Sequence, residues 1–349
     1  MTDMPDMPDV PDKPNVPEMN QPALISTNGL SVEFNISKTL FNPKVLKAVD
    51  GVSIDIPKGS FFGVVGESGS GKTTLGHALL KAKPIAHGSV TYDDGEVRYD
   101  LATLAGPELK DYRKRAQLIF QDPYAALSPR MTVRDIIAEP LEVMGLTKTR
   151  DETDARVREI AAKCRLNLEH LRRFPHAFSG GQRQRISIAR ALVCGPQFIV
   201  ADESVAALDV SIQADVLNLL KSIQAEMGLT FLFISHDLSV VAHTCDHVAV
   251  MYLGRIVESA PTRALFKAPK HPYTKALFSA IPSLDPDDRG RAQKLTGEIP
   301  SATNLPSGCK FHTRCPFVQP RCKDEEPVLE GVATGHSVSC HRWRELAQD

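Results

Sequence analysis

A glycine-rich stretch, residues 66–74, carries side chains suited to binding phosphate, and it follows an apolar run at 61–65. Glycines let backbone N–H groups curl around a phosphate, and the start of a following helix adds partial positive charge. Lys72 is placed to reach β- and γ-phosphate oxygens, and the Thr73 hydroxyl to bind Mg²⁺. The predicted phosphate-binding residues are Gly66, Glu67, Ser68, Gly69, Ser70, Gly71, Lys72, Thr73 and Thr74.

Polar side chains also follow three other apolar runs directly: Gln121, the pair Asp202 and Glu203, and His236 after Ser235. The ligand crevice of an open α/β sheet lies at the carboxyl ends of its strands, so these residues should converge with the glycine-rich stretch. Asp202 would hold the Mg²⁺ shell and Glu203 would polarise water. Alone, an Asp-Glu pair is usually a solvated loop, and a histidine after a strand is usually part of the core. Here the nearby phosphate-binding stretch favours a catalytic role for these residues.

A second glycine-rich loop opens a predicted helix at 182–192 and offers that helix's N-terminus to an anion. Its residues are Ser179, Gly180, Gly181 and Gln182. The loop has no phosphate of its own, so the nucleotide of a dimer partner would fill it. The alternative is that the two glycines are a flexible helix start.

These residues need a framework of buried strands. Five apolar runs are too continuous for strands with one wet face, which indicates a mainly parallel sheet buried by helices. The runs are 61–65, 118–120, 198–201, 231–234 and 248–253. One covering helix is indicated by the helical spacing of its apolar residues. They are Ile212, Val216, Leu219, Leu220, Ile223 and Met227.

Residues 122 to about 195 interrupt this alternation, because three helical patterns, 133–144, 150–164 and 182–192, follow one another with no strand between them. We expect a helical insertion there. Proline at every third position from 5 to 17 favours a disordered, extended tail over residues 1–22. Periodicity is lost from residue 285 onward, where a separate C-terminal module is expected to begin.

Composition excludes several classes of protein. The 349 residues suggest one large domain or two modest ones. With 41 Lys and Arg against 42 Asp and Glu, the net charge is −1, which disfavours nucleic acid as a partner. Apolar runs fall short of the roughly 18 to 20 residues that span a membrane. The N-terminus lacks the features of a secretory signal, so we expect the chain to stay in the cytoplasm.

Four cysteines crowd the C-terminus in the spacing C-x5-C-x6-C-x17-C, unlike the C-x2-C pairs of zinc ribbons. They are Cys309, Cys315, Cys322 and Cys340. Four thiolates favour Zn²⁺ or an iron–sulfur cluster, with His312, His336 and His341 as substitute ligands. The spacing leaves these alternatives, and free thiols, open.

In this order, the motifs of residues 23–284 resemble the ATP-binding cassette (ABC) family, a P-loop NTPase fold with a mainly parallel core sheet, an antiparallel β edge and a helical insertion. The resemblance implies two cassettes that sandwich two ATP molecules, with the 179–182 loop and Asp209 of one chain closing on the nucleotide of the other. It also implies that Gln121 links Mg²⁺ to the helical insertion, that Glu203 is the general base, and that His236 contacts the γ-phosphate.

The stretches 121–124, 174–176 and 271–274 resemble the oligopeptide and dipeptide importer branch, and Gln182 with 208–213 resembles its F-type ATPase. This implies a peptide importer at the cytoplasmic face of the membrane, with a second, unequal ATPase or a homodimer, two membrane permeases and an extracytoplasmic substrate-binding protein. In this branch the four C-terminal cysteines of 285–349 can hold a 4Fe–4S cluster. Oligosaccharides or nickel are alternative cargoes, and a soluble, non-transport ABC ATPase is an alternative class.

Two departures from the family stand beside the general base: Ser204 replaces the usual proline and Ala206 the usual serine. A lost hydroxyl removes a hydrogen bond worth about 0.5–1.5 kcal/mol, and losing the proline frees φ. We predict hydrolysis that survives but is slower or less tightly coupled. For stacking on adenine, Phe41 is the ring closest to the expected position.

Overall fold

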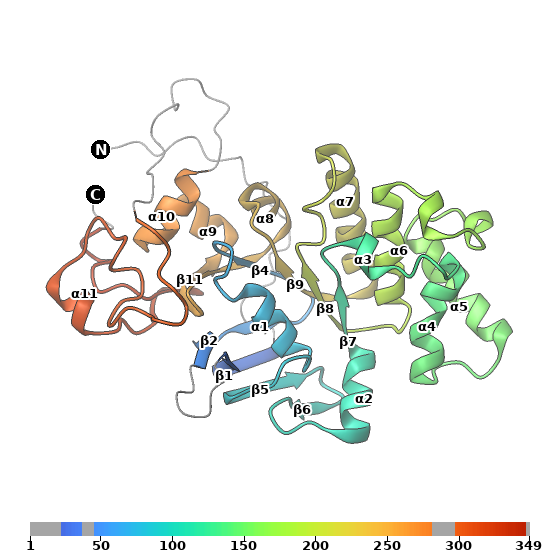
Figure 1. Ribbon diagram of the computed structural model, residues 1–349, viewed down its shortest axis with the longest axis horizontal. Helices are drawn as coiled ribbons and strands as arrows, with labels where there is room; N and C mark the ends of the chain where they lie inside the picture. The colour runs from blue at the N-terminus through green and yellow to red at the C-terminus, as the bar shows by residue number, and fades with distance from the viewer. Residues whose placement is uncertain (1–21, 37–44, 281–296, 347–349) are drawn as a thin grey trace.

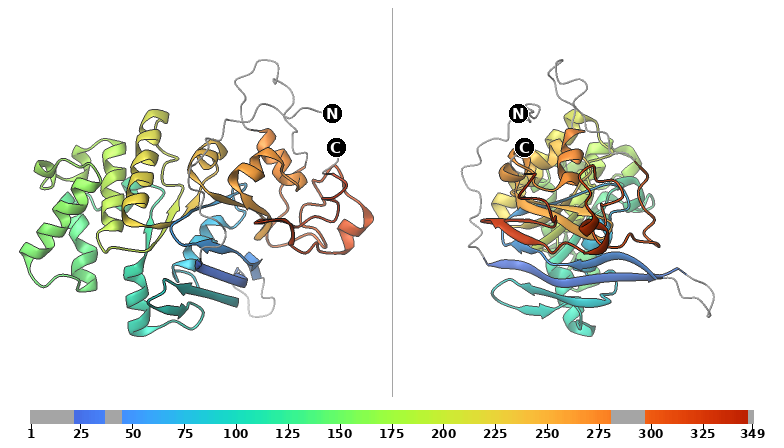
Figure 2. Two further views of the ribbon diagram at one scale, coloured as in Figure 1. Left: turned by 180° about the vertical axis from the view of Figure 1, so that it is seen from behind. Right: turned by 90° about the vertical axis from the view of Figure 1, so that its left-hand side faces the viewer.

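The computed structural model describes residues 22–36, 45–280 and 297–346, which form two sheets with helices packed around them (Figure 1). The expected tail falls outside this range except for Pro22, and so does Phe41. Figure 2 shows the helical insertion and the C-terminal region at opposite ends of the molecule.

The larger sheet has the strand order β12-β13-β11-β10-β4-β9-β8-β7, and its strands from β10 to β7 are parallel. Those five strands are β4 (Phe61–Val65), β7 (Ala116–Ile119), β8 (Phe198–Asp202), β9 (Thr230–Ile234) and β10 (His247–Tyr252). They are the five predicted runs. Every residue of the inner four strands is buried, which explains their continuous apolar sequences. Strand β7 lies at the edge, and Phe120 falls beyond its end, 43% exposed.

Helices cover both faces of this sheet, and a separate cluster of buried apolar residues lies on each face. They include α1 (Lys72–Leu79), α7 (Val210–Met227), α8 (Leu238–Thr244), α9 (Thr262–Lys267) and α10 (Pro272–Ser279). In α7 the predicted stripe is confirmed: Val216, Leu219, Leu220 and Ile223 are buried, and its two end residues pack against the same cluster while partly exposed.

The predicted helical insertion is present. It contains α3 (Pro123–Ala126), α4 (Val133–Met144), α5 (Arg150–Lys163), α6 (Gly180–Leu192) and two short 3-10 helices, Leu168–His170 and Pro175–Ala177. Threonine hydroxyls of Thr132 and Thr149 accept backbone N–H bonds at the starts of α4 and α5, which fixes where those helices begin. Helix α6 begins at Gly180, two residues before the predicted start, because Ser179 caps it.

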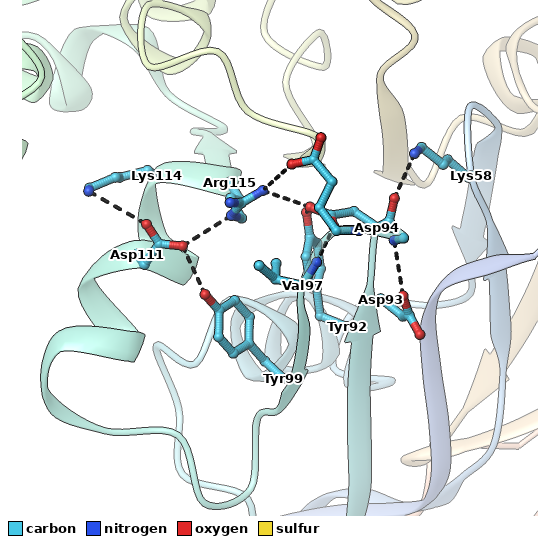
Figure 3. A network of polar contacts seen from close by, with 11 residues as sticks. Lys58, Tyr92, Asp93, Asp94, Val97, Tyr99, Asp111, Lys114 and Arg115 are labelled. Atoms are coloured by element: carbon cyan, nitrogen blue, oxygen red, sulfur yellow. Dashed lines mark hydrogen bonds and ion pairs between the residues drawn. The ribbon is translucent and has the colours of Figure 1, made fainter.

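The second sheet is antiparallel and contains β1 (Ala23–Asn35), β2 (Val45–Val52), β3 (Asp55–Pro57), β5 (His87–Asp93) and β6 (Arg98–Asp100). A polar network joins it to α2 (Gly106–Arg115) (Figure 3). Arg115 donates from Nη1 to Asp94 (2.8 Å) and from Nε to Asp111 (3.1 Å), while Tyr92 and Tyr99 donate their hydroxyls to the same two carboxylates. Since α2 leads directly into β7, the network attaches this sheet to the core.

The C-terminal region contains α11 (Pro320–Asp324), β12 (Glu330–Ala333) and β13 (His336–Val338). Strand β13 pairs antiparallel with β11 (Arg255–Pro261) of the larger sheet. His336 Nε2 lies 2.8 Å from the Glu258 carboxylate, and both side chains are buried. The C-terminal region therefore continues the core sheet. The boundary expected near 285 falls at 281–296, outside the described residues, and the division into domains stays a prediction.

Across 22–36, 45–280 and 297–346, none of the helices combines the length and the apolar character needed to span a bilayer.

Candidate nucleotide site

The loop between β4 and α1 has a backbone path that only glycine follows at two points. Gly66 has φ +150°, and a Cβ there would lie 2.1 Å from the carbonyl oxygen of Met251. Gly71 has φ +104°, and a Cβ would lie 2.1 Å from the carbonyl oxygen of Ala48. Any side chain at either position would force the backbone apart. The loop thus curls tightly at the carboxyl end of β4, as the sequence predicted.

Lys72, the first residue of α1, lies inside this curl. Its Nζ donates to the carbonyl oxygens of Gly66 (2.8 Å) and Glu67 (2.9 Å), and the residue is only 5% exposed. Burial lowers the pKa of the Lys72 ammonium, and the nearby carboxylates oppose that shift. This places one buried cation within the phosphate-binding loop.

Thr73 and Asp202 meet across the gap between α1 and β8, where Thr73 Oγ1 donates to Asp202 Oδ1 over 3.1 Å. Burial raises the pKa of the Asp202 carboxyl, although the hydrogen bond from Thr73 opposes the shift. A hydroxyl and a carboxylate are oxygen donors of the kind that Mg²⁺ prefers. The two residues therefore fit the predicted Mg²⁺ site.

Three strand ends meet at Glu203. Gln121 donates from Nε2 to Glu203 Oε2 over 2.8 Å, and His236 Nδ1 lies 3.3 Å from Glu203 Oε1. The Glu203 backbone has φ +45°, uncommon for a residue with a side chain, and its N–H donates to the carbonyl oxygen of Ile234 (2.9 Å). The predicted convergence of Gln121, Glu203 and His236 is present in the structure. Such a constrained backbone is often found at functional sites.

The 179–182 loop lies at the N-terminus of α6. Ser179 and Gln182 form a capping box: the Ser179 N–H donates to Gln182 Oε1 (3.1 Å), and the Gln182 N–H donates to Ser179 Oγ (3.4 Å). A Cβ on Gly181 would lie 2.5 Å from the Ile212 side chain of α7. Asp209 immediately precedes α7. Figure 1 shows α6 with α4 and α5 at one end of the molecule, whereas α1 lies against the central strands. One chain therefore does not bring this loop to Lys72.

The two departures differ in their surroundings. Ser204 is 2% exposed, and its hydroxyl has no hydrogen-bond partner within the ranges that the structure describes. Ala206 is exposed, and its N–H donates to the carbonyl oxygen of Glu203 (3.1 Å). No pattern in the sequence indicated that the Ser204 hydroxyl would be buried next to Glu203.

Two further residues contact the loop, and the sequence analysis assigned neither of them to it. The Glu67 N–H donates to the Tyr273 hydroxyl (2.9 Å), and both Nη atoms of Arg314 donate to the Glu67 carboxylate (2.7 and 3.0 Å). Tyr273 belongs to a stretch already noted for its resemblance to the importer branch. No local pattern points to Arg314, which lies 247 residues from its partner.

The four C-terminal thiols line a single cavity together with His271, Phe311 and His312. Burial raises the pKa of Cys309 to about 11 and that of Cys340 to about 12, which favours neutral thiols. Among the residues described, no group of three or more His, Cys, Asp or Glu side chains could hold a metal ion. The iron–sulfur cluster and the zinc ion expected here therefore receive no support from the side-chain positions.

Comparison with known proteins adds two family matches. Residues 49–206 match the family "ABC transporter", and residues 257–322 match "Oligopeptide/dipeptide transporter, C-terminal region". A putative peptide import ATP-binding protein of Brucella ovis is 49% identical over 324 residues, which cover 93% of this chain and 99% of the relative. The oligopeptide transport ATP-binding protein OppF of Salmonella typhimurium is 48% identical over 326 residues, covering 91% and 95%. AppF of Bacillus subtilis, also an oligopeptide transport ATP-binding protein, is 44% identical, covering 93% and 98%.

Solved structures agree with this match. A dimeric ATP-binding cassette in a post-hydrolysis state with ADP and Pi aligns with a TM-score of 0.60 at 25% identity, covering 68% of this chain and 99% of that one. A dimeric bacterial ABC transporter cassette aligns with a TM-score of 0.59 at 26% identity, with the same coverage. The fold, the loop geometry and nearly full-length identity of 44–49% lead to one conclusion. The chain belongs to the ATP-binding proteins of the ABC transporter family, in the branch that carries the oligopeptide/dipeptide transporter C-terminal region.

Proposed function

We propose that this chain binds and hydrolyses ATP and thereby energises an importer of oligopeptides or dipeptides. The observation that carries the proposal is the meeting of Gln121 and His236 on the Glu203 carboxylate, beside the Lys72 loop. The relatives named above, which are described as peptide import and oligopeptide transport ATP-binding proteins, support the cargo.

In this proposal residues 66–74 cradle the phosphates, and Lys72 reaches the β and γ oxygens. Thr73, Asp202 and Gln121 would hold Mg²⁺, which neutralises phosphate charge when bound. The Glu203 carboxylate polarises the attacking water and takes its proton. His236 contacts the γ-phosphate. Since His236 and Gln121 both contact Glu203 in this structure, a bound γ-phosphate would be sensed through the same carboxylate.

The second half of each ATP site would come from another chain. Its contribution is the α6 N-terminus with Ser179, Gly180, Gly181 and Gln182, together with Asp209. The placement of α6 away from α1 supports this arrangement, and so do the two similar solved cassettes, which are dimeric. This chain would be the F-type ATPase. Its partner would be a second, unequal ATPase or another copy of this chain.

The proposed complex also contains two membrane permeases and an extracytoplasmic substrate-binding protein, with this chain held peripherally at the cytoplasmic face of the membrane. ATP binding favours the closed dimer, hydrolysis reopens it, and the helical insertion passes the motion to the permeases. Oligosaccharides and nickel remain alternative cargoes. A soluble, non-transport ABC ATPase is the alternative class, and the match to the transporter C-terminal region argues against it.

The 4Fe–4S cluster stays a proposal that rests on the family resemblance. Cys309, Cys315, Cys322 and Cys340 line one cavity, but no metal-holding group is found among the described residues. If the cluster is present, anaerobically purified protein should be brown and contain iron and sulfide. Colourless protein with stoichiometric zinc, or with neither metal, would reject it.

The experiment that tests the function is ATP-dependent uptake of a labelled tri- to pentapeptide into proteoliposomes that contain the whole complex. Wild type is compared with Glu203→Gln. Uptake that depends on ATP and is abolished by the substitution supports a peptide importer energised by this chain. ATP hydrolysis without peptide uptake would keep the ATPase and reject the cargo. An absence of hydrolysis would reject both.

A further inference from the structure

An arginine of the C-terminal region neutralises a carboxylate inside the phosphate-binding loop. Arg314 donates from Nη1 to Glu67 Oε2 (2.7 Å) and from Nη2 to Glu67 Oε1 (3.0 Å), the two-pronged geometry that makes such pairs strong and directional. The Arg314 side chain is 5% exposed and that of Glu67 is 23% exposed. This pair is therefore screened far less than an ion pair on the surface.

Glu67 is the point where three contacts fix the loop. Its carbonyl oxygen accepts from Lys72 Nζ, its N–H donates to the Tyr273 hydroxyl, and its carboxylate is bound by Arg314. The first contact comes from α1, the second from α10 and the third from the C-terminal region. The backbone of the loop is consequently held from outside as well as from within.

Arg314 is itself held in place. Its N–H donates to the carbonyl oxygen of Phe311 (3.0 Å), and Phe311 is 1% exposed. The Phe311 ring packs against Tyr252 and Tyr273, with 5.4 Å between ring centres in each case. The guanidinium also lies 6.0 Å from the centre of the Tyr252 ring. Arg314 is thus anchored to the aromatic cluster that supports the loop.

The negative charge of Glu67 is the reason why its pairing with Arg314 affects nucleotide binding. A carboxylate in a loop that binds a triphosphate repels its ligand unless a cation compensates it. We propose that Arg314 is a positioning residue of the nucleotide site: it compensates Glu67 and holds it away from the phosphates. The proposal rests on the proposed function, because it assumes that ATP is the ligand of the loop.

The test is equilibrium binding of Mg-ATP to the full-length chain. Arg314→Gln should raise the Kd about tenfold, which corresponds to about 1.4 kcal/mol, because it leaves the Glu67 charge uncompensated. Adding Glu67→Gln to Arg314→Gln should restore most of the affinity, since the repelling charge is then gone. Arg321→Gln is the matched control: it breaks an exposed pair with Glu325 in the same region, 2.7 Å long, and should leave the Kd unchanged.

Further measurements distinguish a role of Arg314 in nucleotide binding from a role in stability alone. Arg314→Lys keeps the positive charge and should bind ATP more tightly than Arg314→Gln, at equal thermal unfolding midpoints. In ATPase assays Arg314→Gln should raise KM while kcat stays near the wild-type value, because Glu203 is untouched. A wild-type Kd for Arg314→Gln would overturn the proposal, and so would a double variant that binds no better than Arg314→Gln. Wild-type protein that does not bind ATP would instead overturn the proposed function.

Discussion

Replacing the carboxylate of Glu203 by an amide is the most direct test of the hydrolytic site. Glu203→Gln keeps the shape of the side chain, and the backbone at +45° stays anchored by its N–H bond to Ile234. The new amide oxygen still accepts from Gln121 Nε2, so the geometry is preserved and only the base is lost. Loss of a general base lowers the rate by about 10²- to 10⁴-fold, which is about 2.7–5.4 kcal/mol of barrier.

Two measurements are needed for this variant. ATP turnover should fall by that factor, and ATP should convert the variant, with its partner chain, into a stable closed dimer visible by size-exclusion chromatography. Glu226→Gln, which removes an exposed partner of Lys163, is the matched control and should behave like wild type in both assays. Turnover of Glu203→Gln within about threefold of wild type would refute the assignment of the base.

Three other substitutions test separate parts of the structure. Gly181→Ala places a Cβ 2.5 Å from Ile212 and should lower the free energy of unfolding by about 1–3 kcal/mol, measured by denaturant titration; unchanged stability would show that the two helices separate without cost. Ala206→Ser should raise ATP turnover if the missing hydroxyl slows hydrolysis, whereas equal turnover would show that the departure is neutral. Burial raises the pKa of Asp94, but backbone N–H bonds, the Tyr92 hydroxyl and Arg115 outweigh it, so the pKa lies below its usual 3.8. Wild type should therefore exceed Asp94→Asn in unfolding free energy at pH 7, and the difference should shrink as the pH falls below about 3.8; a difference independent of pH would contradict this.

The parallel core was predictable because strands that are buried on both faces have continuous apolar sequences. All five runs, from Phe61 to Tyr252, are strands, and the convergence of Gln121, Glu203 and His236 follows from strand direction alone. Very short strands lack such a run and are not recognised from the sequence. Strand β13, which pairs with β11, has only three residues, and the adjoining β12 has four with alternating exposure, so the pairing of the C-terminal region with β11 was not foreseen.

Contacts between distant parts of the chain were also beyond prediction. Arg314 has ordinary neighbours in sequence, and only the folded chain brings it within 2.7 Å of Glu67. The buried Ser204 hydroxyl belongs to the same class, since its exposure depends on how the loop after β8 packs. The cysteine spacing left a metal site and free thiols open; the four thiols line one cavity, but the described residues show no metal-holding geometry.

The pairing of β13 with β11 has a consequence for where the chain can be cut. Opposite β13, residues Glu258 and Ser259 of β11 use their backbone groups to continue the ladder. Truncation before residue 297 would uncover that ladder as a free edge, able to pair with β-strands of other molecules. It would also leave the fully buried Glu258 carboxylate without His336. The C-terminal region thus covers this edge of the sheet, and a shortened chain should aggregate through the exposed β11 strand.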